Sequence, residues 1–470
     1  MNIVHLSAEC YPVAKVGGLA DVVGALPKYQ NGLGHEACVI MPFYDLSFTQ
    51  KNKFKCTYKG SLKLGSSSYR YSVMEPVDLN LGFQLYLIKI PDLLFTNYVY
   101  SDDDAKRFLA FQIACLNWLA SKEQLPDVIH CHDHHTGLIP FMAQYCHEYE
   151  VFEKTPSILS IHNAQYQGWF SHKLIDLIPQ FDRKHTGLLD WDGSINPLGC
   201  AIKCAWRVNT VSPSYMEELK QEANGLEILL THEAAKCVGI LNGIDTTVWD
   251  TNTDSFLKKN YSKSSVLSGK KANKKWLCTT YNLDVKKPLF AFIGRLVYEK
   301  GSDLFPEAFE QILQDQEVSI LLLGSGDKNT QQRLVELKKK YEGSYNLYVG
   351  YDEALSHVIY AGADFLLMPS RVEPCGLNQM YSLRYGTIPI VRGTGGLKDT
   401  IVDIENDGFG FIHLEATAAH IFSTVKRAVT LYKDQKRFKK IRKQIMNIDH
   451  SWDKSASTYI QLYKSLTNRS

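Results

Sequence analysis

The chain has 470 residues, which is too long for one compact core and indicates two domains of roughly 200 residues each. Its 52 lysines and arginines nearly balance 50 acidic residues, so no bulk positive field would recruit nucleic acid or an anionic membrane. The start, MNIVHLSAEC, lacks a signal-peptide pattern, and no segment offers about 18 unbroken apolar residues. We therefore expect a soluble, cytoplasmic protein with neither nucleic-acid nor membrane partners.

Short apolar runs alternate with longer amphipathic stretches along the whole chain. In the first half they predict strands at Ile3–Leu6, Cys38–Met41, Phe83–Ile90, Val128–His130, Ser157–His162 and Val208–Val211. In the second half they predict strands at Leu289–Ile293, Ser319–Leu323, Asn346–Val349, Phe365–Met368 and Ile388–Val391. The fully apolar runs LFAFIG and FLLMPS are typical of central strands in a parallel sheet covered on both faces. The pattern predicts an α/β protein with two βαβ arrays in tandem.

The boundary between the two arrays is expected just after LNGID, residues Leu241–Asp245. A polar stretch rich in Lys, Ser and Asn, Thr251–Lys275, follows it before the next strand pattern opens. Open α/β sheets bind ligands outside the carboxyl ends of their strands. With two such domains, the expected active site is the cleft between them.

The first segment with chemical potential is KVGGLADV, which follows the opening strand. Gly17 and Gly18 let the backbone approach a ligand, and their N–H groups near a helix start suit a phosphate. Lys15 adds a flexible cation, and Asp21 offers a carboxylate to sugar hydroxyls. A structural strand-to-helix turn is the competing interpretation of the glycine pair. The segment is not the G-x-G-x-x-G pattern of dinucleotide enzymes.

Histidines gather at the ends of two further predicted strands. IHCHDHHTG holds four histidines and Asp133, and SIHNAQYQG places His162 and Asn163 at the end of the next strand. Metal binding is one interpretation of the cluster, but no cysteine or further carboxylate completes an evident ligand set. We predict structural or hydrogen-bonding roles for these histidines, no bound metal, and a functional role for Asp133. His162 either faces a ligand or is a satisfied core histidine.

Cations and helix starts follow the strands of the second half. In FIGRLVYEKG, Arg295 and Lys300 stand at the mouth of a buried strand, where two cations suit a pyrophosphate and a solvated loop pair is the alternative. After MPSRVEPCGL, Glu373 leads into a helix whose N–H groups near Gly376 and Leu377 can point at an anion. A second glycine turn opens another helix about twenty residues on; it is formed by Thr394, Gly395, Gly396 and Leu397. These parts predict a diphosphate site that needs no divalent metal.

Taken together, the segments resemble the bacterial glycogen synthase and plant starch synthase family. KVGGLADV, HDHHTG, IHNAQYQG, NGID, GRLVYEKG, EPCGLNQMY, TGGLKDT and the ending SWDKSASTYIQLYKSL match it in order and spacing along nearly the whole chain. The resemblance implies a retaining, metal-independent glucosyltransferase without cofactors. Its partners would be a nucleotide-sugar donor and an α-1,4-glucan acceptor such as glycogen. ADP-glucose is the expected donor, and UDP-glucose stays open as the alternative.

The resemblance also implies the GT-B architecture, in which two Rossmann-like domains face each other across a deep cleft. Residues 1–245 would form the acceptor-side domain and residues 246–449 the nucleotide-sugar domain. Residues 450–470 would form a helix that crosses back onto the first domain.

Site residues are carried over from the family motifs position by position. Lys15 is implied to bind the donor, Arg295 and Lys300 to clamp the diphosphate, and Glu373 to be essential for turnover. His162 is implied to be catalytic, near the transferred glucose. Implied sugar, glucan or phosphate contacts are Asp133, Cys375, Gly376, Leu377, the TGGL turn at 394–397 and, more weakly, Tyr98 and Asn242.

The chain departs from the family pattern at positions that flank the chemistry. Val372, Asn378, Ser382 and Gly393 stand where the family commonly has Phe, Thr, Gly and Arg, and His134 stands where Trp is common. These departures bear on loop packing and nucleotide choice more than on the reaction. Tyr381 stands where many other retaining families place a second Glu, which favours the synthase family.

Retention of configuration is compatible with a covalent glycosyl-enzyme or with front-face transfer. Double displacement needs a carboxylate beneath the anomeric carbon, and Glu373 suits holding sugar hydroxyls better. We therefore expect front-face transfer, in which the departing diphosphate takes the proton of the acceptor's 4-hydroxyl. Competing hypotheses are a transferase that acts on a small sugar acceptor, a silent glucan-binding protein and a metal-dependent hydrolase.

Overall fold

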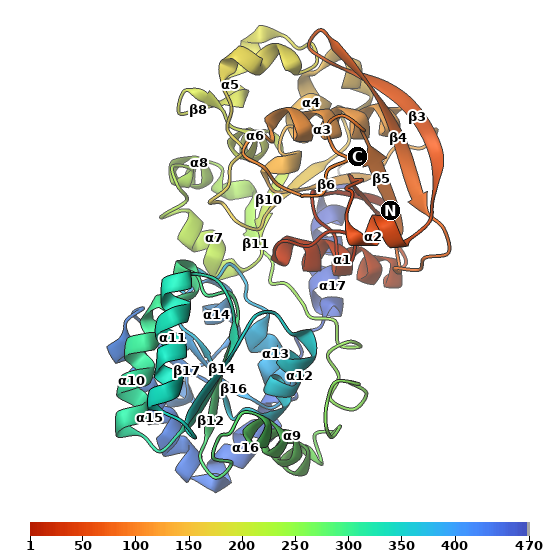
Figure 1. Ribbon diagram of the computed structural model, residues 1–470. Helices are drawn as coiled ribbons and strands as arrows, with labels where there is room; N and C mark the ends of the chain where they lie inside the picture. The colour runs from red at the N-terminus through yellow and green to blue at the C-terminus, as the bar shows by residue number, and fades with distance from the viewer. Residues whose placement is uncertain (468–470) are drawn as a thin grey trace. The chain divides into compact units, whose positions relative to one another are not determined.

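The computed structural model describes residues 1–467 and divides the chain into two compact units (Figure 1). The first unit comprises Met1–Leu241 together with the chain from Trp452 onward, and the second comprises Asn242–Ser451. The last three residues of the predicted C-terminal helix, 468–470, lie outside the described residues. Each unit is described by itself.

A nine-stranded sheet with the order β11-β10-β7-β6-β1-β2-β5-β4-β3 forms the centre of the first unit. The strands are β1 (Asn2–Leu6), β2 (Glu36–Pro42), β3 (Phe54–Leu64), β4 (Ser67–Pro76), β5 (Gln84–Lys89), β6 (Val128–His132), β7 (Ser157–Ile161), β10 (Arg207–Thr210) and β11 (Cys237–Gly239). All pairings from β11 to β5 are parallel. The strand order reverses at β1, so the topological switch point lies between β1 and β6.

Helices and a small ribbon complete the first unit. The helices are α1 (Gly18–Gly32), α2 (Ser47–Lys51), α3 (Ala105–Ala120), α4 (Ile139–Tyr145), α5 (Thr186–Leu189), α6 (Pro197–Cys204), α7 (Pro213–Leu219), α8 (Glu227–His232) and α17 (Trp452–Thr467). The ribbon pairs β8 (Asp190–Trp191) with β9 (Ser194–Ile195). The helix expected at 104–119 is α3, one residue further along.

The sequence prediction missed the antiparallel hairpin β3–β4 at the sheet edge, which Figure 1 shows as two long strands. Its strands carry many exposed polar residues, with burial alternating only in part, so they lack the apolar runs that identified the central strands. The short strand β11 was missed for the same reason, since it is only three residues long and partly exposed. Every strand predicted in the first half is present, within two residues at each end.

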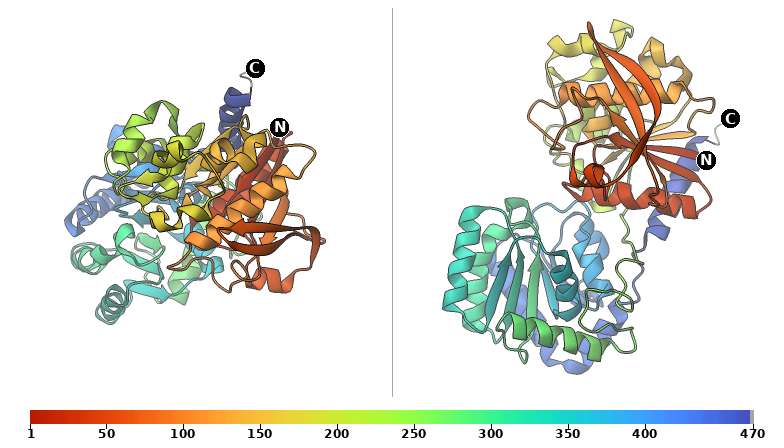
Figure 2. Two further views of the ribbon diagram at one scale, coloured as in Figure 1. Left: turned by 90° about the horizontal axis from the view of Figure 1, so that it is seen from above. Right: turned by 45° about the vertical axis from the view of Figure 1, so that its right-hand side comes forward.

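The C-terminal helix α17 packs against α1 within the first unit, and Figure 2 shows the two helices side by side. Its buried face joins a cluster with Ile3, Val22 and Ile158 from β1, α1 and β7. The face consists of Trp452, Ala456, Tyr459, Ile460, Tyr463 and Leu466. The spacing of three and four residues is that of an amphipathic helix with one apolar stripe. The expected return of this helix to the first unit is therefore present in the described residues.

The second unit contains a six-stranded, fully parallel sheet with the order β14-β13-β12-β15-β16-β17. The strands are β12 (Leu289–Ile293), β13 (Ser319–Gly324), β14 (Tyr345–Val349), β15 (Phe365–Met368), β16 (Ile388–Arg392) and β17 (Phe411–His413). Numbered from β12, this is the 3-2-1-4-5-6 order of a Rossmann sheet, with its switch point between β12 and β15. The prediction found all of these strands except β17, which is short and only partly apolar.

Helices cover both faces of this sheet, with α10 and α11 on one side and α12 and α13 on the other (Figure 1). The helices of the unit are α9 (Val266–Thr280), α10 (Phe305–Asp315), α11 (Lys328–Lys340), α12 (Glu353–Gly362), α13 (Asn378–Arg384), α14 (Gly395–Thr400), α15 (Ala418–Lys433) and α16 (Gln435–Ile445). Helix α9 begins within the polar stretch Thr251–Lys275, where the sequence analysis predicted no element. Its buried lysines explain that difference, because they make the helix look solvated in sequence.

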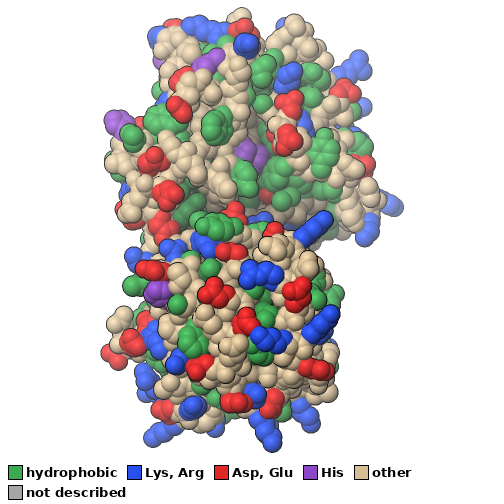
Figure 3. Space-filling view, turned by 60° about the vertical axis from the view of Figure 1, so that its left-hand side comes forward, with side chains coloured by type: hydrophobic (Ala, Val, Ile, Leu, Met, Phe, Trp, Pro, Cys, Tyr) green, Lys and Arg blue, Asp and Glu red, His purple; other side chains and the backbone are tan. Residues whose placement is uncertain are grey.

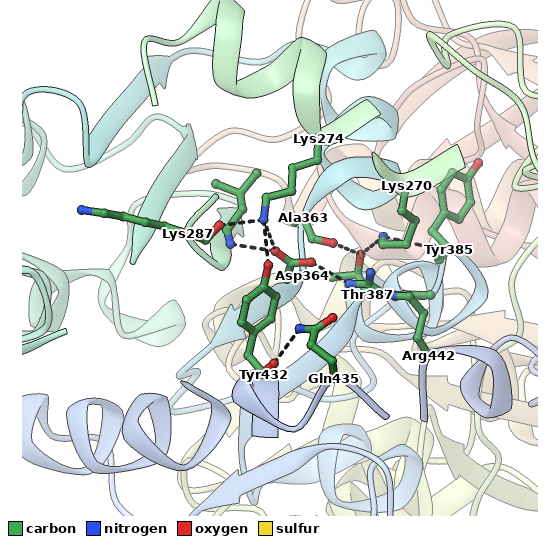
Figure 4. A network of polar contacts seen from close by, with 12 residues as sticks. Lys270, Lys274, Lys287, Ala363, Asp364, Tyr385, Thr387, Tyr432, Gln435 and Arg442 are labelled. Carbon is green, nitrogen blue, oxygen red and sulfur yellow. Dashed lines mark hydrogen bonds and ion pairs between the residues drawn. The ribbon is translucent and has the colours of Figure 1, made fainter. Parts of the chain in front are cut away.

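A buried polar network ties α9, β15 and α16 together (Figure 4). The Asp364 carboxylate accepts hydrogen bonds from Lys274 and Arg442, each at 2.7 Å. Burial alone would raise the pKa of Asp364, but the two cations outweigh it and lower the pKa to about 2. The Lys270 amine donates to the carbonyls of Tyr360 and Tyr385, and burial holds its pKa well below the usual range.

Figure 3 shows acidic and basic side chains interspersed over one face of the molecule, as the near-zero net charge suggests. Within residues 1–467, no helix is both long enough and apolar enough to cross a membrane.

Candidate active site

In the first unit, the predicted site residues follow the strands on either side of the switch point. The KVGGL segment lies between β1 and α1, and Asp133 directly follows β6. Strand β7 ends at Ile161, one residue before the predicted strand end, so His162 and Asn163 directly follow it. Because parallel strands end at one edge of the sheet, these segments converge there.

The glycine turn is held by a residue that the sequence prediction missed. The Glu9 carboxylate is almost fully buried and accepts the backbone N–H groups of Val16 and Gly17, at 2.5 and 2.9 Å. It also accepts the hydroxyl proton of Tyr100. The Gly17 amide was expected to face a phosphate, but it is occupied by this internal carboxylate. The clue in the sequence was an acid at the carboxyl end of the opening strand.

The two glycines of this turn are exposed and crowd nothing. A Cβ built on Gly17 or Gly18 would meet no atom within 4 Å, and neither residue has a positive φ. Packing and backbone conformation within the described residues therefore do not require glycine at these positions. Next to the turn, the half-exposed Lys15 amine lies 2.6 Å from the Asp21 carboxylate. Both side chains are thus available for exchange with a ligand, because exposed ion pairs contribute only about 0–1 kcal/mol.

Asp133 connects the ends of β6 and β7. Its Oδ1 accepts the backbone N–H of His162 at 2.7 Å and that of Asn163 at 3.5 Å. Burial raises the pKa of Asp133 to about 7, against the lowering effect of these two N–H groups. The residue has φ 56° and ψ −175°, a conformation that is nearly restricted to glycine. A strained, buried acid at a strand end is typical of a functional position.

Two predicted side chains of the first unit have modest local roles. Tyr98 is 45% exposed and stacks with the Arg107 guanidinium, 5.0 Å from the ring centre. The Asn163 Oδ1 accepts the backbone N–H of Gln165 and so shapes the loop after β7. Neither contact uses the Tyr98 hydroxyl or the Asn163 side-chain N–H groups, which could bind a sugar.

In the second unit, Lys300 and Glu373 form the centre of the candidate site. The Lys300 amine donates to both carboxylate oxygens of Glu373, at 2.7 and 2.6 Å, and the Ser370 hydroxyl donates to one of them at 2.9 Å. Glu373 is buried, whereas the Lys300 side chain is 28% exposed. Lys300 follows β12 and Glu373 follows β15, so the pair straddles the switch point of the Rossmann sheet.

Backbone contacts fix the two loops that carry this pair. The Glu299 carbonyl accepts the N–H groups of Arg371 and Val372, and the Arg371 guanidinium forms a two-pronged ion pair with Asp303, at 2.6 and 2.9 Å. The positive φ of Gly301 lets its loop approach the Pro369 carbonyl, which a Cβ would meet at 2.4 Å. The geometry of the pair is therefore a property of the loops rather than of the two side chains.

The TGGL turn packs directly on the loop that carries Glu373. Gly396 donates its N–H to the Glu373 carbonyl at 3.1 Å. A Cβ on Gly395 would meet that same carbonyl at 2.0 Å, and a Cβ on Gly396 would meet the Cys375 carbonyl at 2.1 Å. Burial raises the pKa of the Cys375 thiol to about 12, so it stays protonated. These glycines are thus required for close packing, whatever their further role.

The remaining predicted residues surround this centre. Arg295 is exposed, and it forms no hydrogen bond or ion pair with residues 1–467. Gly376 has φ 73°, and Leu377 precedes the first residue of α13. The N–H of Asn242 points at the Cys375 sulfur, and the Asn242 Oδ1 is buried without a hydrogen-bond partner in the described chain. At the start of α13, the Asn378 amide donates to the Ile293 carbonyl at 2.8 Å, which ties α13 to the end of β12.

The comparisons with known proteins agree along the whole chain. Residues 2–232 match the model of the starch synthase catalytic domain, and residues 279–444 match that of the glycosyl transferases group 1. The glycogen synthase of Flavobacterium johnsoniae is 49% identical over 466 residues, which are 98% of this chain and 98% of that relative. The chain belongs to the glycogen and starch synthase family.

Other members of the family and the fold neighbours extend this result. The glycogen synthase of Streptococcus sanguinis is 36% identical over 479 residues, which cover 99% of this chain and 100% of that relative. The catalytic domain of starch synthase IV from Arabidopsis thaliana, solved with ADP and acarbose bound, has TM-score 0.90 and 32% identity over 100% of this chain and 99% of that chain. Sucrose-phosphate synthase from Thermosynechococcus elongatus shares the fold, with TM-score 0.65 and 17% identity over 100% and 99% of the two chains.

These findings confirm two of the expectations from sequence. The fold is the GT-B type, built from two α/β units whose sheets are largely parallel. The chain is a glucosyltransferase of glycogen or starch synthesis, as the family shows. The roles of individual site residues stay predictions, which are argued next.

Proposed function

We propose that this chain transfers glucose from ADP-glucose to the non-reducing 4-hydroxyl of an α-1,4-glucan such as glycogen, with retention of configuration and without a metal ion. The observation that carries the proposal is the Lys300–Glu373 pair, held 2.6 Å apart at the switch point of a Rossmann sheet. Such a switch point is where open α/β sheets bind nucleotide ligands. The second unit is accordingly the proposed donor domain, and the first unit the acceptor domain.

Two points support the choice of donor and acceptor. The Arabidopsis starch synthase IV structure is described as bound to ADP and acarbose, which favours an adenine nucleotide over UDP. Two relatives that are 49% and 36% identical to this chain are named glycogen synthases, which favours glycogen over a small sugar as acceptor. UDP-glucose remains the alternative donor.

In the proposed mechanism, Arg295 and Lys300 neutralise the charge that grows on the departing diphosphate. Charge-assisted hydrogen bonds to phosphate are about twice as strong as neutral ones. Arg295 is exposed and unengaged within residues 1–467, so a phosphate would displace no internal partner. Lys300 would share its three N–H donors between Glu373 and the diphosphate. Two cations at this position would supply the charge that a divalent metal supplies in other transferases.

The surroundings of Glu373 favour front-face transfer over double displacement. Both carboxylate oxygens already accept hydrogen bonds, from Lys300 and from Ser370, which lowers their nucleophilicity. The same contacts orient the carboxylate to hold sugar hydroxyls. The diphosphate oxygen that leaves the sugar would then take the proton from the acceptor's 4-hydroxyl on the same face.

The other predicted residues complete the proposed site as contacts rather than as reacting groups. Cys375, Gly376, Leu377, Asn242 and the TGGL backbone would line the donor. In the first unit, His162 would contact the transferred glucose. The proposed donor or glucan contacts there are Lys15, Gly17, Gly18, Asp21, Tyr98, Asp133 and Asn163.

A donor competition tests this function. The purified protein receives glycogen and equal concentrations of ADP-glucose and UDP-glucose, one of them labelled in each run, with and without EDTA. We expect label to enter glycogen mainly from ADP-glucose, without effect of EDTA, in linkages that an α-1,4-specific exo-amylase removes.

Each part of the proposal has its own contrary result. Faster transfer from UDP-glucose overturns the donor assignment. Transfer to fructose 6-phosphate but not to glycogen overturns the acceptor assignment. Loss of activity in EDTA overturns metal independence, and linkages that resist the α-specific amylase overturn retention.

A further inference from the structure

A continuous chain of buried hydrogen bonds runs from His162 to the C-terminal helix within the first unit. His162 Nε2 lies 2.9 Å from His132 Nδ1, and His132 Nε2 lies 3.0 Å from His5 Nδ1. His5 Nε2 then lies 2.8 Å from the Gln30 Oε1, and the Gln30 amide nitrogen lies 3.2 Å from the Tyr463 hydroxyl. His162 follows β7, the other four side chains come from β6, β1, α1 and α17, and all five are buried. The path therefore joins a proposed glucose contact to the end of the chain.

A second branch leaves the Tyr463 hydroxyl in the opposite direction. It runs to His130 Nδ1 at 2.7 Å, and His130 Nε2 lies 2.7 Å from the Ser160 hydroxyl. Ser160 donates to Asn209 at 2.7 Å, and Asn209 donates to the Tyr459 hydroxyl at 2.9 Å. Tyr459 and Tyr463 lie one turn apart on the buried face of α17. The Tyr463 hydroxyl joins the two branches, and the second branch reaches the Tyr459 hydroxyl.

Metal binding is the competing use of the same imidazoles. The ring nitrogens of His5, His130 and His132 lie within 4.8 Å of one another. All six of these nitrogens, however, already have a hydrogen-bond partner: His132, Gln30, Tyr463, Ser160, His5 and His162. A metal ion would have to break several of these buried contacts, each costly to leave unmade. The geometry favours a hydrogen-bonded chain.

The chain has a direction because each member is neutral. Burial lowers the pKa of His5 to about 4 and that of His162 to about 3, and holds that of His132 well below the usual range. A neutral imidazole donates from one nitrogen and accepts at the other. The Gln30 carbonyl oxygen can only accept, so His5 carries its proton on Nε2 and accepts at Nδ1. It follows that His132 donates from Nε2, and that His162 donates from Nε2 to His132 Nδ1.

The distances at Tyr463 agree with this direction. The 3.2 Å separation from the Gln30 amide fits an N–H donor, whereas hydroxyl donors usually come within about 2.8 Å. The 2.7 Å separation between the Tyr463 oxygen and His130 Nδ1 fits an O–H donor. Tyr463 thus accepts from Gln30 and donates to His130. This arrangement keeps the carbonyl end of Gln30 turned toward His5.

We propose that this buried chain fixes His162 in the tautomer protonated on Nε2, so that its Nδ1 presents a lone pair to a hydroxyl of the bound sugar. The proposal rests on the proposed function for the identity of that sugar. The hydrogen bonds of His162 within residues 1–467 engage its backbone N–H and Nε2, and they leave Nδ1 for a ligand. Gln30 and Tyr463 are positioning residues, which act on the sugar through His5, His132 and His162.

Two matched tyrosine variants on α17 test the proposal. Tyr463→Phe removes the group that orients Gln30, so either end of the amide can face His5. Tyr459→Phe removes a hydroxyl of equal burial from the same helix, at the far end of the other branch. We expect imidazole nitrogen NMR of isotope-labelled protein to show His162 protonated only on Nε2 in the wild type and in Tyr459→Phe, and a mixture of tautomers in Tyr463→Phe. The His162 resonances are identified by their loss in His162→Gln.

Kinetics supply a second readout. Mixed tautomers in Tyr463→Phe should lower kcat about two- to fivefold, as expected for one weakened hydrogen bond, with little change in the KM for ADP-glucose. Tyr459→Phe should retain wild-type kcat. Thermal unfolding of both variants separates this effect from a general loss of stability. Since the two hydroxyls are equally buried in one helix, removing either should lower the melting temperature by a similar amount.

Substitution of Gln30 gives an independent check should Tyr463→Phe not fold. Gln30→Glu, protonated in this buried position, offers a carbonyl to His5 and a hydroxyl to Tyr463, so His162 should keep one tautomer. Gln30→Leu offers neither and should give a mixture. A wild-type His162 protonated on Nδ1 overturns the proposal, and so does a single tautomer in both Tyr463→Phe and Gln30→Leu. Because NMR needs no turnover, these results are independent of whether the proposed glucosyl transfer is correct.

Discussion

In each of the two units, a lysine of the candidate site forms an ion pair with an acidic residue of the same site. Lys15 pairs with Asp21, and Lys300 pairs with Glu373. The first pair is largely exposed, so water screens it and its exchange with a ligand costs about 1 kcal/mol or less. In the second pair the acid is buried and also bound by Ser370, so the acid is fixed and the lysine is the adjustable partner. Because Lys300 stays paired with this fixed acid, it can bind a phosphate in addition without changing its position.

Lys300→Ala is expected to lower kcat by about a hundred- to a thousandfold, which is typical for the loss of one group that stabilises transition-state charge. The variant also leaves the Glu373 carboxylate buried with only Ser370 as a side-chain donor, so the melting temperature should fall. Initial rates of glucose incorporation into glycogen, measured well below that temperature, give kcat. Glycogen affinity, measured by co-sedimentation, should change little.

Lys340→Ala is the matched control, because Lys340 also pairs with a glutamate of the second unit, Glu310, but on the surface. It should retain wild-type kcat. If Lys300→Ala turns over at the wild-type rate, Lys300 does not bind the leaving diphosphate, and the charge would have to be met by other groups.

Two glycine substitutions separate a ligand contact from a packing contact. Gly18 begins α1, and a Cβ there would meet nothing within 4 Å. Gly18→Ala should therefore leave stability unchanged or raise it by about 0.5 kcal/mol, since alanine favours helices. If a ligand approaches this turn, the added methyl group should lower kcat/KM for ADP-glucose about tenfold or more.

Gly396→Ala should behave in the opposite way. Its Cβ would meet the Cys375 carbonyl at 2.1 Å, so α14 must shift, at a cost of about 1–3 kcal/mol of unfolding free energy. Chemical denaturation and donor kinetics on both variants check the pair. Wild-type kinetics in Gly18→Ala would show that the KVGGL turn does not contact the donor and has a structural role only.

At the scale of elements, burial determined what the sequence could predict. The runs at Leu289–Ile293 and Phe365–Met368 are apolar because helices cover both faces of their sheet, and both strands were predicted to the residue. The hairpin β3–β4 has an exposed edge and no such run, so it was missed. Likewise, the motifs located the ends of strands correctly, but they did not identify the hydrogen-bond partners of those residues. Even Glu9, an acid near the end of the opening strand, could not be assigned to the amides of Val16 and Gly17 from sequence.

The Asp364 network makes a testable prediction about how α9, β15 and α16 hold together (Figure 4). Asp364→Asn leaves the ammonium of Lys274 and the guanidinium of Arg442 buried without a counter-charge, which should cost about 3–5 kcal/mol. The pKa of Asp364 is lowered from 3.8 to about 2, so its contribution to stability is present above pH 4 and lost as the pH falls toward 2.

Chemical denaturation as a function of pH checks this prediction. The difference in unfolding free energy between the wild type and Asp364→Asn should be constant above pH 4 and shrink below it. Glu310→Gln, which breaks an exposed pair of the same unit, should cost no more than about 1 kcal/mol. Equal effects of the two substitutions would show that the buried network does not stabilise the unit.

At the scale of the whole molecule, the two units differ in which parts of the chain supply their core residues. The core cluster of the second unit draws all its residues from a single stretch, Leu257–Ile445. One cluster of the first unit instead combines β1, α1 and β7 with the buried face of α17, more than 200 residues later. The sequence predicted this return only through family resemblance, because an amphipathic stripe does not reveal which surface it covers.

Deletion of α17 should therefore unfold the first unit and leave the second intact. The chain 1–241 alone would expose Ile3, Val22 and Ile158 and lose the aromatic side chains of α17, at about 1.5–3 kcal/mol for each fully buried one. The chain 242–451 keeps its whole core and should fold and melt cooperatively.

A rejoined chain distinguishes a missing helix from a general intolerance to cutting. The Ser455 hydroxyl donates to the Leu241 carbonyl at 2.6 Å, so the start of α17 lies beside the point where the first unit ends. Residues 1–241 joined to 452–467 through a short Gly-Ser linker should consequently fold, because closing a short loop costs little conformational entropy. Circular dichroism and thermal melting of the three chains decide the matter. A folded 1–241, or a rejoined chain that stays unfolded, would show that α17 is not the element that completes this core.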